Sequence, residues 1–470
     1  MSGSDCAGCR ERDAVIAELE QRLGEQDQRL RELEARLKTN SANSSLPPSA
    51  NPPSAPKPQP KPPSGRKPGG QPGHRGHCRT RLPPDRVNHI VRHLPCHCER
   101  CQAALPQESS PGDPQPTWHQ VAELLPVLAS VTEHQGHART CSGCGHVTWG
   151  QIPPEVLAHA FGPNLGAAIA FLSGRCHDSK RTIQEVVQTL LGVPLSLGSV
   201  ANAEREVAAA LQAPYAQAEA AVAAAAVKNA DETGWALAGK LCWMWMAVAG
   251  GVALFKICLG RGRAALRQLL GGEVRGTVGS DRWTAYGIID LWCRQVCWAH
   301  LKRDFQKWVD WGEEAARIGQ AGVEAVQRLF ELWGKFREGV LDRPGLQAAL
   351  EPVMTDLRAA LQAGLSCPIK KAARFCRNLL AVYPAPWTFA RVEGVEPTNN
   401  LAERTLRLAV IWRKISFGNH SAGGCRFVER ILTVVQTLRM QNRQVLGYLR
   451  AAVAAHRNGQ PAPVLVNLGA

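Results

Sequence analysis

Residues 227–259 of this 470-residue chain, VKNADETGWALAGKLCWMWMAVAGGVALFKICL, decide its fold. Residues 227–237 follow an alanine-rich segment and have the composition of a β-strand. The two apolar runs behind them flank the pair Gly250-Gly251 and predict a β-hairpin. The apolar stretch 241–255 is shorter than the roughly 20 residues of a membrane helix, so we expect a buried hairpin.

A helix and a fourth strand follow the hairpin. RAALRQLL (263–270) has helical spacing, and VRGTVGSDRWTAY (274–286) contains a strand that ends at Ser280 and Asp281. The order strand, hairpin, helix, strand predicts a ribonuclease-H-like core. In that arrangement Asp231 lies beside Asp281, and two unpaired carboxylates side by side need a cation. The alternative is that each acid is a solvated side chain or a turn residue.

The stretch NNLAERTLRLAVIWRK (399–414) predicts a basic helix that carries one acid. Five residues recur at helical spacing and are expected to form its buried stripe: Leu401, Thr405, Leu408, Trp412 and Ile415. Glu403 lies on a different face of this helix, together with Arg407 and Lys414. A single acid on the basic face therefore needs an explanation.

Two interpretations of Glu403 are open. With Asn399 or Asn400 as N-cap, the helix dipole and an i, i+4 pair with Arg407 stabilise the carboxylate without a ligand. Alternatively, Glu403 supplies a third metal carboxylate, while Arg407 and Lys414 bind the phosphates of a DNA strand.

The second interpretation predicts a two-metal site. Asp231, Asp281 and Glu403 would hold two Mg²⁺ (or Mn²⁺) ions, which prefer oxygen ligands. Such a pair activates a water or a 3′-hydroxyl on one side of a phosphodiester and stabilises the leaving oxygen on the other. Glu393 and Glu396 compete for the role of third acid, but neither is expected on a helix that would fix it.

Composition indicates the partner and the compartment. The formal net charge of +15 and the pI near 9.3 suit a polyanion, and the sequence has no basic amphipathic anchor, so nucleic acid is favoured over a membrane. The opening MSGSDCAGCRERD has no apolar signal-peptide core. Sixteen cysteines then favour the reducing cytoplasm, where Cys-x-x-Cys pairs more often bind metal than form disulfides. We expect a cytoplasmic, nucleoid-associated protein of several folded units.

Residues 1–38 predict a leucine-zipper-like coiled coil. Seven positions alternate spacings of three and four: Ile16, Leu19, Leu23, Gln26, Leu30, Leu33 and Leu37. Charged neighbours favour self-association into a homo-oligomer, and a lone amphipathic helix is the alternative. The pair Cys6 and Cys9 ahead of the seam is either disordered or holds a metal shared between two chains.

Residues 39–81 form a Pro-, Ser- and Gly-rich linker that is too poor in apolar residues to pack a core. Between Lys57 and Cys101 the sequence holds ten Lys or Arg against two acids. Phosphate contacts are therefore expected along this stretch.

Residues 82–150 are expected to form a zinc-ribbon-like domain. Two Cys-x-x-Cys pairs match a tetrahedral, structural Zn²⁺ site: Cys98, Cys101, Cys141 and Cys144. Cys96, His97 and His146 compete as ligands, and the alternative is that the thiols only fill space. Since the site has no obvious open position, its expected role is folding and DNA contact.

Residues 151–226 are rich in Ala and Leu at helical spacing. The stretch TIQEVVQTLLGVPLSLGSVANAEREVAAAL (182–211) contains a turn between two helical runs. It predicts either a helix-turn-helix that docks on duplex DNA or a plain pair of packing helices.

Several stretches in this order resemble one known family. They are NSSLPPS (43–49), GRKPGGQPGHRG (65–76), DETGW (231–235), SDRWTAY (280–286), CWAHLKRDF (297–305), NNLAERTLRLAVIWRKISFG (399–418) and SAGG (421–424). Together with the cysteine pairs, they resemble the large transposase protein of the bacterial insertion-sequence-sixty-six family over nearly the whole chain.

The resemblance implies a DDE-type recombinase with a zipper, a zinc domain, a ribonuclease-H-like catalytic domain and a short C-terminal domain. The family's three acids fall on Asp231, Asp281 and Glu403. The family's insertion explains the long helical stretch between the last two acids, and we expect it to contact DNA or a partner subunit. The implied parts are a catalytic core at 227–310 and 391–440, a helical insertion at 311–390 and a C-terminal domain at 441–470.

Another family stretch falls on His300, Lys302 and Arg303. These residues are expected to bind DNA or to line the catalytic pocket, although His300 alternatively caps or packs a helix.

The complete expectation is a multidomain α+β protein that acts as a DNA transposase. It would bind terminal inverted repeats, cut the DNA there and join the freed 3′-hydroxyls to target DNA, without membrane association. Accessory proteins encoded by the same element are further candidate partners. Two alternatives are a non-catalytic, zinc-containing DNA-binding regulator derived from a transposase, and a structure-selective nuclease of the same fold.

Overall fold

The computed structural model describes most of the chain. The residues described are 7–37, 39–41, 43–44, 81–106, 108, 113–114, 117, 119–122 and 129–466. The chain divides into two compact units, one of residues 1–55 with 129–470 and one of residues 56–128. Most of the predicted linker, together with Cys6 and the side chain of Cys9, lies outside the described residues.

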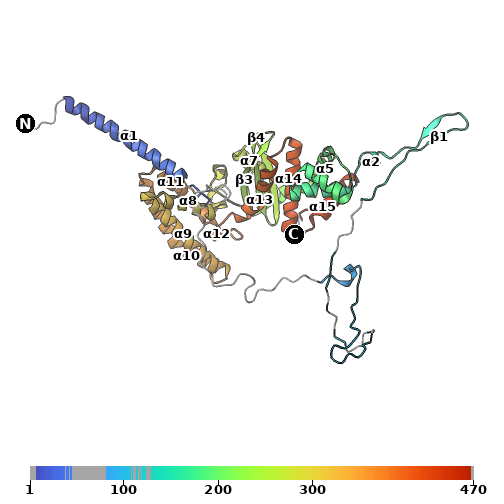
Figure 1. The fold of residues 1–470 in the computed structure, drawn as a ribbon. Helices are drawn as coiled ribbons and strands as arrows, with labels where there is room; N and C mark the ends of the chain where they lie inside the picture. The colour runs from blue at the N-terminus through green and yellow to red at the C-terminus, as the bar shows by residue number, and fades with distance from the viewer. Residues whose placement is uncertain are drawn as a thin grey trace, which may run out of the picture. The chain divides into compact units, whose positions relative to one another are not determined.

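A five-stranded mixed sheet forms the centre of the larger unit (Figure 1). Its strands are β3 (Val227–Leu237), β4 (Lys240–Ala249), β5 (Val252–Cys258), β6 (Thr277–Ser280) and β7 (Arg294–Val296). Their spatial order is β5-β4-β3-β6-β7. The first three run antiparallel, while β3, β6 and β7 run parallel. The fold is thus mixed α/β, and the predicted succession of strand, hairpin, helix and strand is present.

The hairpin of β4 and β5 is buried, as the sequence predicts. Gly250 and Gly251 in its turn have φ of 52° and 76°, the positive values that a tight two-residue hairpin turn requires. Trp245 and Phe255 on the two strands are fully buried. Among the described residues, no helix combines the length and apolarity needed to cross a membrane.

Helix α14 (Ala422–Met440) covers the edge of the sheet at β5. Alternate amides of an edge strand point away from the sheet and need acceptors. Three of them donate to α14 side chains: Ala253 N–H to Thr437 Oγ1 (3.1 Å), Phe255 N–H to Thr433 Oγ1 (3.0 Å) and Ile257 N–H to Glu429 Oε1 (2.6 Å). The donors are two residues apart on β5, an advance of about 6.8 Å, and the acceptors are four residues apart on α14, an advance of about 6 Å. The spacing of the donors therefore nearly matches that of the acceptors.

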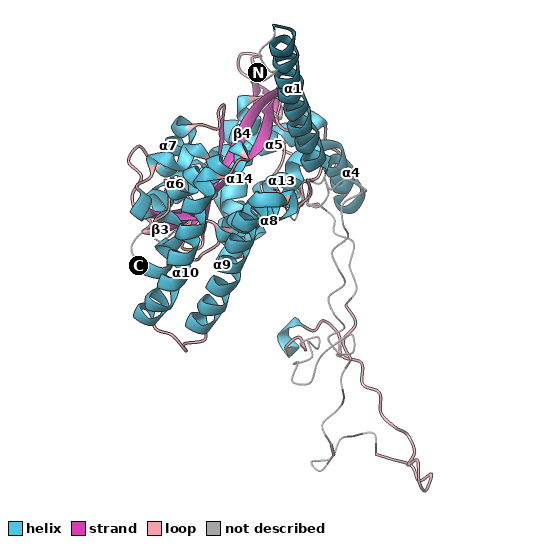
Figure 2. Ribbon diagram, turned by 90° about the vertical axis from the view of Figure 1, so that its left-hand side faces the viewer, coloured by secondary structure: helices cyan, strands magenta, loops and turns pink. Residues whose placement is uncertain are grey.

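Four helices build a second hydrophobic core. They are α8 (Trp298–Trp311), α9 (Glu313–Arg337), α10 (Arg343–Ala363) and α11 (Lys370–Leu380). Helices α9 and α10 lie side by side (Figure 2). Trp298 packs edge-on against Trp387 at a ring-centroid distance of 4.8 Å. The stretch predicted as a helical insertion is therefore helical, and α8 packs with it.

The helices before the sheet and at the C-terminus share the sheet's core. Helix α5 (Leu197–Ala210) follows α4 (Lys180–Leu191) after a short turn, as the sequence predicts. It packs against α3 (Pro163–Phe171), α14 and α15 (Val445–Arg457). These contacts favour the packing pair over the DNA-docking alternative, which stays a prediction.

The N-terminal helix α1 (Ala7–Leu37) presents an apolar seam to solvent. Six of its side chains are between 48% and 62% exposed: Val15, Ile16, Leu19, Leu23, Leu30 and Leu33. All except Val15 belong to the predicted zipper seam. The helix is thus present, and its pairing with a second copy stays a prediction.

We expect the substitution Leu23→Glu to lower the oligomeric state, because it places a charge in the seam that the zipper would bury. Gln21→Glu adds the same charge on the outer face and is the matched control. Sedimentation equilibrium of the full chain measures both variants. Equal masses for wild type, Leu23→Glu and Gln21→Glu would contradict the coiled coil.

Candidate functional site

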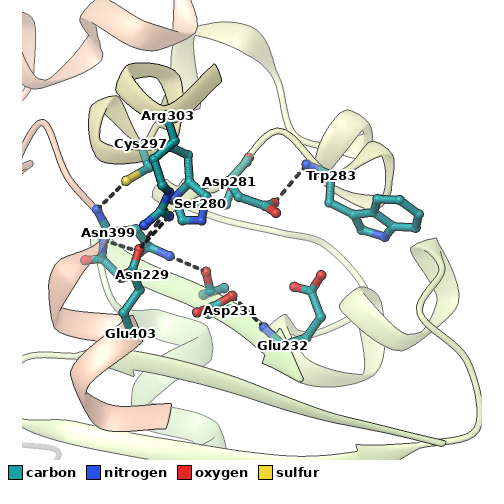
Figure 3. Close-up of polar contacts among 12 residues, drawn as sticks. Asn229, Asp231, Glu232, Ser280, Asp281, Trp283, Cys297, Arg303, Asn399 and Glu403 are labelled. Atoms are coloured by element: carbon teal, nitrogen blue, oxygen red, sulfur yellow. Dashed lines mark hydrogen bonds and ion pairs between the residues drawn. The ribbon is translucent and has the colours of Figure 1, made fainter. Parts of the chain in front are cut away.

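Asp231 and Asp281 lie at the carboxyl ends of neighbouring parallel strands. The register pairs Asn229 of β3 with Gly279 of β6, so two residues further along Asp231 faces Asp281. Figure 3 shows their carboxylates in one group. Asp231 Oδ1 accepts from the Glu232 N–H (2.9 Å), and Asp281 Oδ1 accepts from the Trp283 N–H (2.8 Å). The sheet thus brings together the two acids that the sequence places together.

Glu403 reaches the same place from the first turn of α13 (Asn400–Ser416). Asn399, the residue before this helix, is 1% exposed and is bonded to β3. Its Nδ2 donates to the Ala230 carbonyl (2.8 Å), and its Oδ1 accepts from Asn229 Nδ2 (2.8 Å). These bonds fix the start of α13 against the strand that carries Asp231.

Gly279 makes room for this contact. A Cβ at that position would lie 2.5 Å from Asn229 Nδ2, closer than non-bonded atoms approach. The glycine in the sequence VGSD therefore allows the Asn229 amide to lie over β6 and to reach Asn399.

The prediction for the buried stripe of α13 is partly wrong. Leu401 and Ile415 are 42% and 55% exposed, and Leu408 is only partly buried. The buried residues are Ala402, Thr405, Leu406, Ala409 and Trp412. Since α13 packs on β3 and β4, small side chains at two of these positions permit the close approach that leucines would prevent.

The site holds an unusual density of acids. Burial raises the pKa of Asp231 well above its usual value, the charge of Glu232 raises it further, and smaller contributions come from Asp281 and Glu403. Glu232, by contrast, has partners: Arg261 Nε donates to it at 2.8 Å and the Tyr286 hydroxyl at 2.7 Å. Asp231 is thus a partly buried residue whose carboxylate lies among acids, and the hydrogen bond found for it among the described residues comes from the Glu232 N–H.

Helix α8 contributes the positive side of the site. His300 Nδ1 lies 3.5 Å and Arg303 Nη2 lies 3.9 Å from Glu403 Oε1. Burial and the charge of Arg303 lower the pKa of His300, against the opposing effect of Glu403. The neutral form of the His300 ring is therefore favoured near pH 7, and Arg303 is the charged partner of Glu403.

The other basic residues predicted to bind DNA are exposed. Lys302 lies on α8, and Arg407 and Lys414 lie on α13, each in contact with solvent. The structure thus brings His300 and Arg303 to the acids, and leaves Lys302, Arg407 and Lys414 on the surface.

Each Cys-x-x-Cys pair forms a small turn. The amides of Cys101 and Arg100 donate toward Cys98 and lower the pKa of its thiol. In the larger unit, the amides of Cys144 and Gly143 do the same for Cys141, between β1 (Ala138–Thr140) and β2 (Val147–Trp149). Amides that turn toward a sulfur favour the thiolate form that binds metal. The two pairs belong to different units, and a shared zinc ion stays a prediction.

Sequence reasoning missed the groups that support the acids. Strand alternation places the adjacent acids of DET on different sides, but nothing in the sequence indicates that Arg261 and Tyr286 pair with Glu232. The sequence predicts Asn399 or Asn400 as N-cap of α13; Asn399 does occupy that position, but its side chain makes no cap bond and donates to β3 instead. The sequence pattern gives Cys297 no role either.

Comparison with known proteins gives the family. The family model described as Transposase IS66 family matches residues 159–426, more than half of the chain. The chain belongs to the Transposase IS66 family. This span contains the sheet, the second core and all three candidate acids, and family membership supports a transposase function. Residues 4–80 match a family of unknown function (DUF6444).

One curated relative of this IS66-family chain is the uncharacterized protein y4qI of Sinorhizobium fredii (strain NBRC 101917 / NGR234). The two are 26% identical over 174 residues, which is 35% of this chain and 31% of the relative. The match therefore spans about a third of the length of that relative.

The raised pKa of Asp231 predicts a pH-dependent stability. Its unfolded pKa is about 3.9 and its folded pKa is higher, so the folded chain binds this proton more tightly. The metal-free IS66-family protein therefore loses stability as the pH rises from about 4 through the folded pKa. We expect Asp231→Asn to raise the melting temperature near pH 8 and to have little effect near pH 4.

Thermal unfolding in a chelator, scanned over pH, measures this difference. Glu393→Gln, which removes an exposed acid outside the site, is the control and should follow wild type. If the melting temperatures of Asp231→Asn and wild type changed in parallel at all pH values, the charge of the Asp231 carboxylate would not lower the stability of the folded protein.

Proposed function

We propose that this chain is a DNA transposase that cuts DNA at the ends of its element and joins the freed 3′-hydroxyls to target DNA. The observation that carries the proposal is the carboxylate of Asp231, which is partly removed from water and has a raised pKa, with Asp281 and Glu403 beside it in a transposase-family chain. Buried acids of like charge are costly unless a cation neutralises them.

The residues present fit divalent cations. Glu403 Oε1 is buried and has no hydrogen-bond partner among the described residues. The raised pKa of Asp231 means that its surroundings destabilise the charged carboxylate, which a nearby cation would offset. We infer that these two, with Asp281, hold Mg²⁺ or Mn²⁺, which take carboxylate oxygens in preference to nitrogen or sulfur. When bound, a pair of such ions activates the attacking water or 3′-hydroxyl and stabilises the leaving oxygen.

The protein's own groups would position these carboxylates. Asn399 holds the start of α13 against β3, and this sets where Glu403 lies. Arg261 and Tyr286 bind Glu232, so that this acid is not available as a competing ligand. A rigid support of this kind matters, because a shift of about 1 Å in a reacting group can cost about 100-fold in rate.

DNA phosphates would be bound by the exposed basic residues around the acids. Lys302 of α8 and Arg404, Arg407 and Lys414 of α13 are exposed, and the net charge of the chain is +15. Such side chains contribute sequence-independent affinity that falls with salt. We propose that His300 and Arg303 line the pocket and that the terminal inverted repeats are read elsewhere.

Two further parts would serve assembly. We propose that Cys98, Cys101, Cys141 and Cys144 bind a structural Zn²⁺, supported by the amides that turn toward Cys98 and Cys141. The exposed seam of α1 would pair with a second copy, so that two DNA ends are held in one complex. A cytoplasmic location and accessory proteins of the same element complete the proposal.

Two alternatives make different predictions. A non-catalytic DNA-binding regulator needs no cluster of neighbouring acids, and the cluster argues against it. A nuclease of the same fold would cut without joining strands. A strand-transfer assay with candidate element ends separates all three.

We expect Asp281→Asn and Glu403→Gln each to reduce Mg²⁺-dependent cleavage of end-containing DNA by more than about 100-fold, the upper range for loss of an outer-shell partner. DNA binding should remain largely intact, because both changes remove negative charge from a site that faces phosphate. A cleavage assay and a filter-binding assay on the same preparations measure the two effects.

Glu393→Gln is the matched control, since Glu393 competes for the third role in the sequence and is exposed in the structure. It should cleave like wild type. Full cleavage by Glu403→Gln, or loss of cleavage in Glu393→Gln, would reassign the third acid.

A further inference from the structure

A second group of metal-binding side chains adjoins the three acids. One ligand atom each of Cys297, His300 and Glu403 lies within 4.8 Å of the others. Cys297 is the residue before α8 and His300 lies in the first turn of that helix, while Glu403 lies in the first turn of α13. The group therefore forms where the N-termini of two helices meet, one from each hydrophobic core.

The sheet also fixes the position of Cys297. The register pairs Ser280 of β6 with Val296 of β7, so one residue further along Cys297 lies beside Asp281. Its N–H donates to the Ser280 carbonyl at 2.9 Å. Its sulfur accepts from the Asn399 N–H at 3.1 Å, as Figure 3 shows. The thiol is 1% exposed, so it cannot turn away into solvent.

Within the described part of the chain, His300 Nδ1 and Glu403 Oε1 have no hydrogen-bond partner. His300 Nδ1 and Glu403 Oε1 are buried, and their separation of 3.5 Å is long for a hydrogen bond. Arg303 Nη2 lies 3.9 Å from Glu403 Oε1, which is also too far for a hydrogen bond. Buried polar atoms without partners commonly indicate a missing ion or water.

We propose that Cys297, His300 and Glu403 bind a borderline-soft transition-metal ion of the Zn²⁺ class, and that this ion inhibits DNA cleavage by withdrawing Glu403 from the catalytic acids. The inhibitory half rests on the proposed function; the binding half does not.

The donor set selects this class of metal. A thiolate and an imidazole favour Zn²⁺ and disfavour Mg²⁺, which prefers oxygen ligands. Three protein ligands with a fourth position for water form a common Zn²⁺ arrangement. On binding, the metal replaces the thiol proton of Cys297, which passes to solvent. The site is distinct from the proposed structural zinc at the two Cys-x-x-Cys pairs.

The inhibition follows because Glu403 would be a ligand in both metal sites. This carboxylate is the proposed third ligand for Mg²⁺ beside Asp231 and Asp281, and the same side chain completes the site with Cys297 and His300. Zn²⁺ that is bound by Glu403 would hold the carboxylate toward α8. Cleavage would then depend on the ratio of the two metals, with Zn²⁺ acting at far lower concentration.

Binding is tested on the full chain by equilibrium dialysis against Zn²⁺ in the presence of excess Mg²⁺. We expect Cys297→Ser and His300→Gln each to bind one Zn²⁺ fewer per chain than wild type, or to bind it at least about ten-fold more weakly. Cys376→Ser removes another buried thiol from the second core and is the control. Metal at the Cys-x-x-Cys pairs is common to all four proteins and cancels in the comparison.

Circular dichroism establishes that each variant is folded. If Cys297→Ser unfolds, His300→Gln decides the result, because the His300 side chain is 18% exposed whereas Cys297 is 1% exposed, so the change at His300 disturbs the core less. Identical Zn²⁺ binding by wild type and His300→Gln would overturn the proposal, whatever the activity.

Inhibition is tested by titrating Zn²⁺ into the Mg²⁺-dependent cleavage reaction, with each protein compared with its own uninhibited rate. We expect the inhibitory concentration to rise at least about ten-fold in His300→Gln and not in Cys376→Ser. Zinc binding without any cleavage would contradict the proposed function and leave the metal site standing. Cleavage with unchanged Zn²⁺ sensitivity would overturn the inhibitory role alone.

Discussion

The partly buried carboxylate of Asp231, set among other acids, is the constraint on which the site depends. It lies beside Glu232, and the charges of Asp281 and Glu403 act on it as well, so that its pKa is raised. A fold that keeps such a group must neutralise it by a proton or by a cation. In the proposed function a cation does so. One neighbour, Glu232, is already bound by Arg261 and Tyr286, whereas Glu403 has only the longer contact of 3.9 Å to Arg303 Nη2.

Two hydrophobic cores meet at this carboxylate. The sheet and α13 supply the three acids from the first core, and α8 supplies His300 and Arg303 at the margin of the second. The residue Asn399 joins them, because its side chain bonds β3 while its N–H donates to Cys297. Any movement of the second core relative to the sheet would therefore change the surroundings of Glu403 directly.

The sequence predicts the sheet well where apolar runs and turn residues agree. The hairpin follows from two apolar runs around Gly250-Gly251, and helix α7 (Arg263–Leu270) spans the very residues that helical spacing indicates. Strand β7 could not be predicted, because it has three residues and two of them, Arg294 and Gln295, are polar yet buried. Their burial depends on partners from distant parts of the chain, such as the Pro386 carbonyl that accepts from Gln295.

The sequence likewise predicts only part of the candidate site. Asp231 and Asp281 follow from strand order, whereas the face that α13 buries includes Ala402 and Ala409, which indicate a buried position less strongly than the leucines of this helix do. The supporting contacts of Asn399 and Cys297 are invisible in the sequence, since each joins residues about 100 or more positions apart.

The most direct test of the account is anomalous diffraction from crystals of the full chain soaked in Mn²⁺. The account predicts anomalous density between the carboxylates of Asp231, Asp281 and Glu403. Density bound only elsewhere on the chain, with these three side chains free of metal at saturating Mn²⁺, would contradict it.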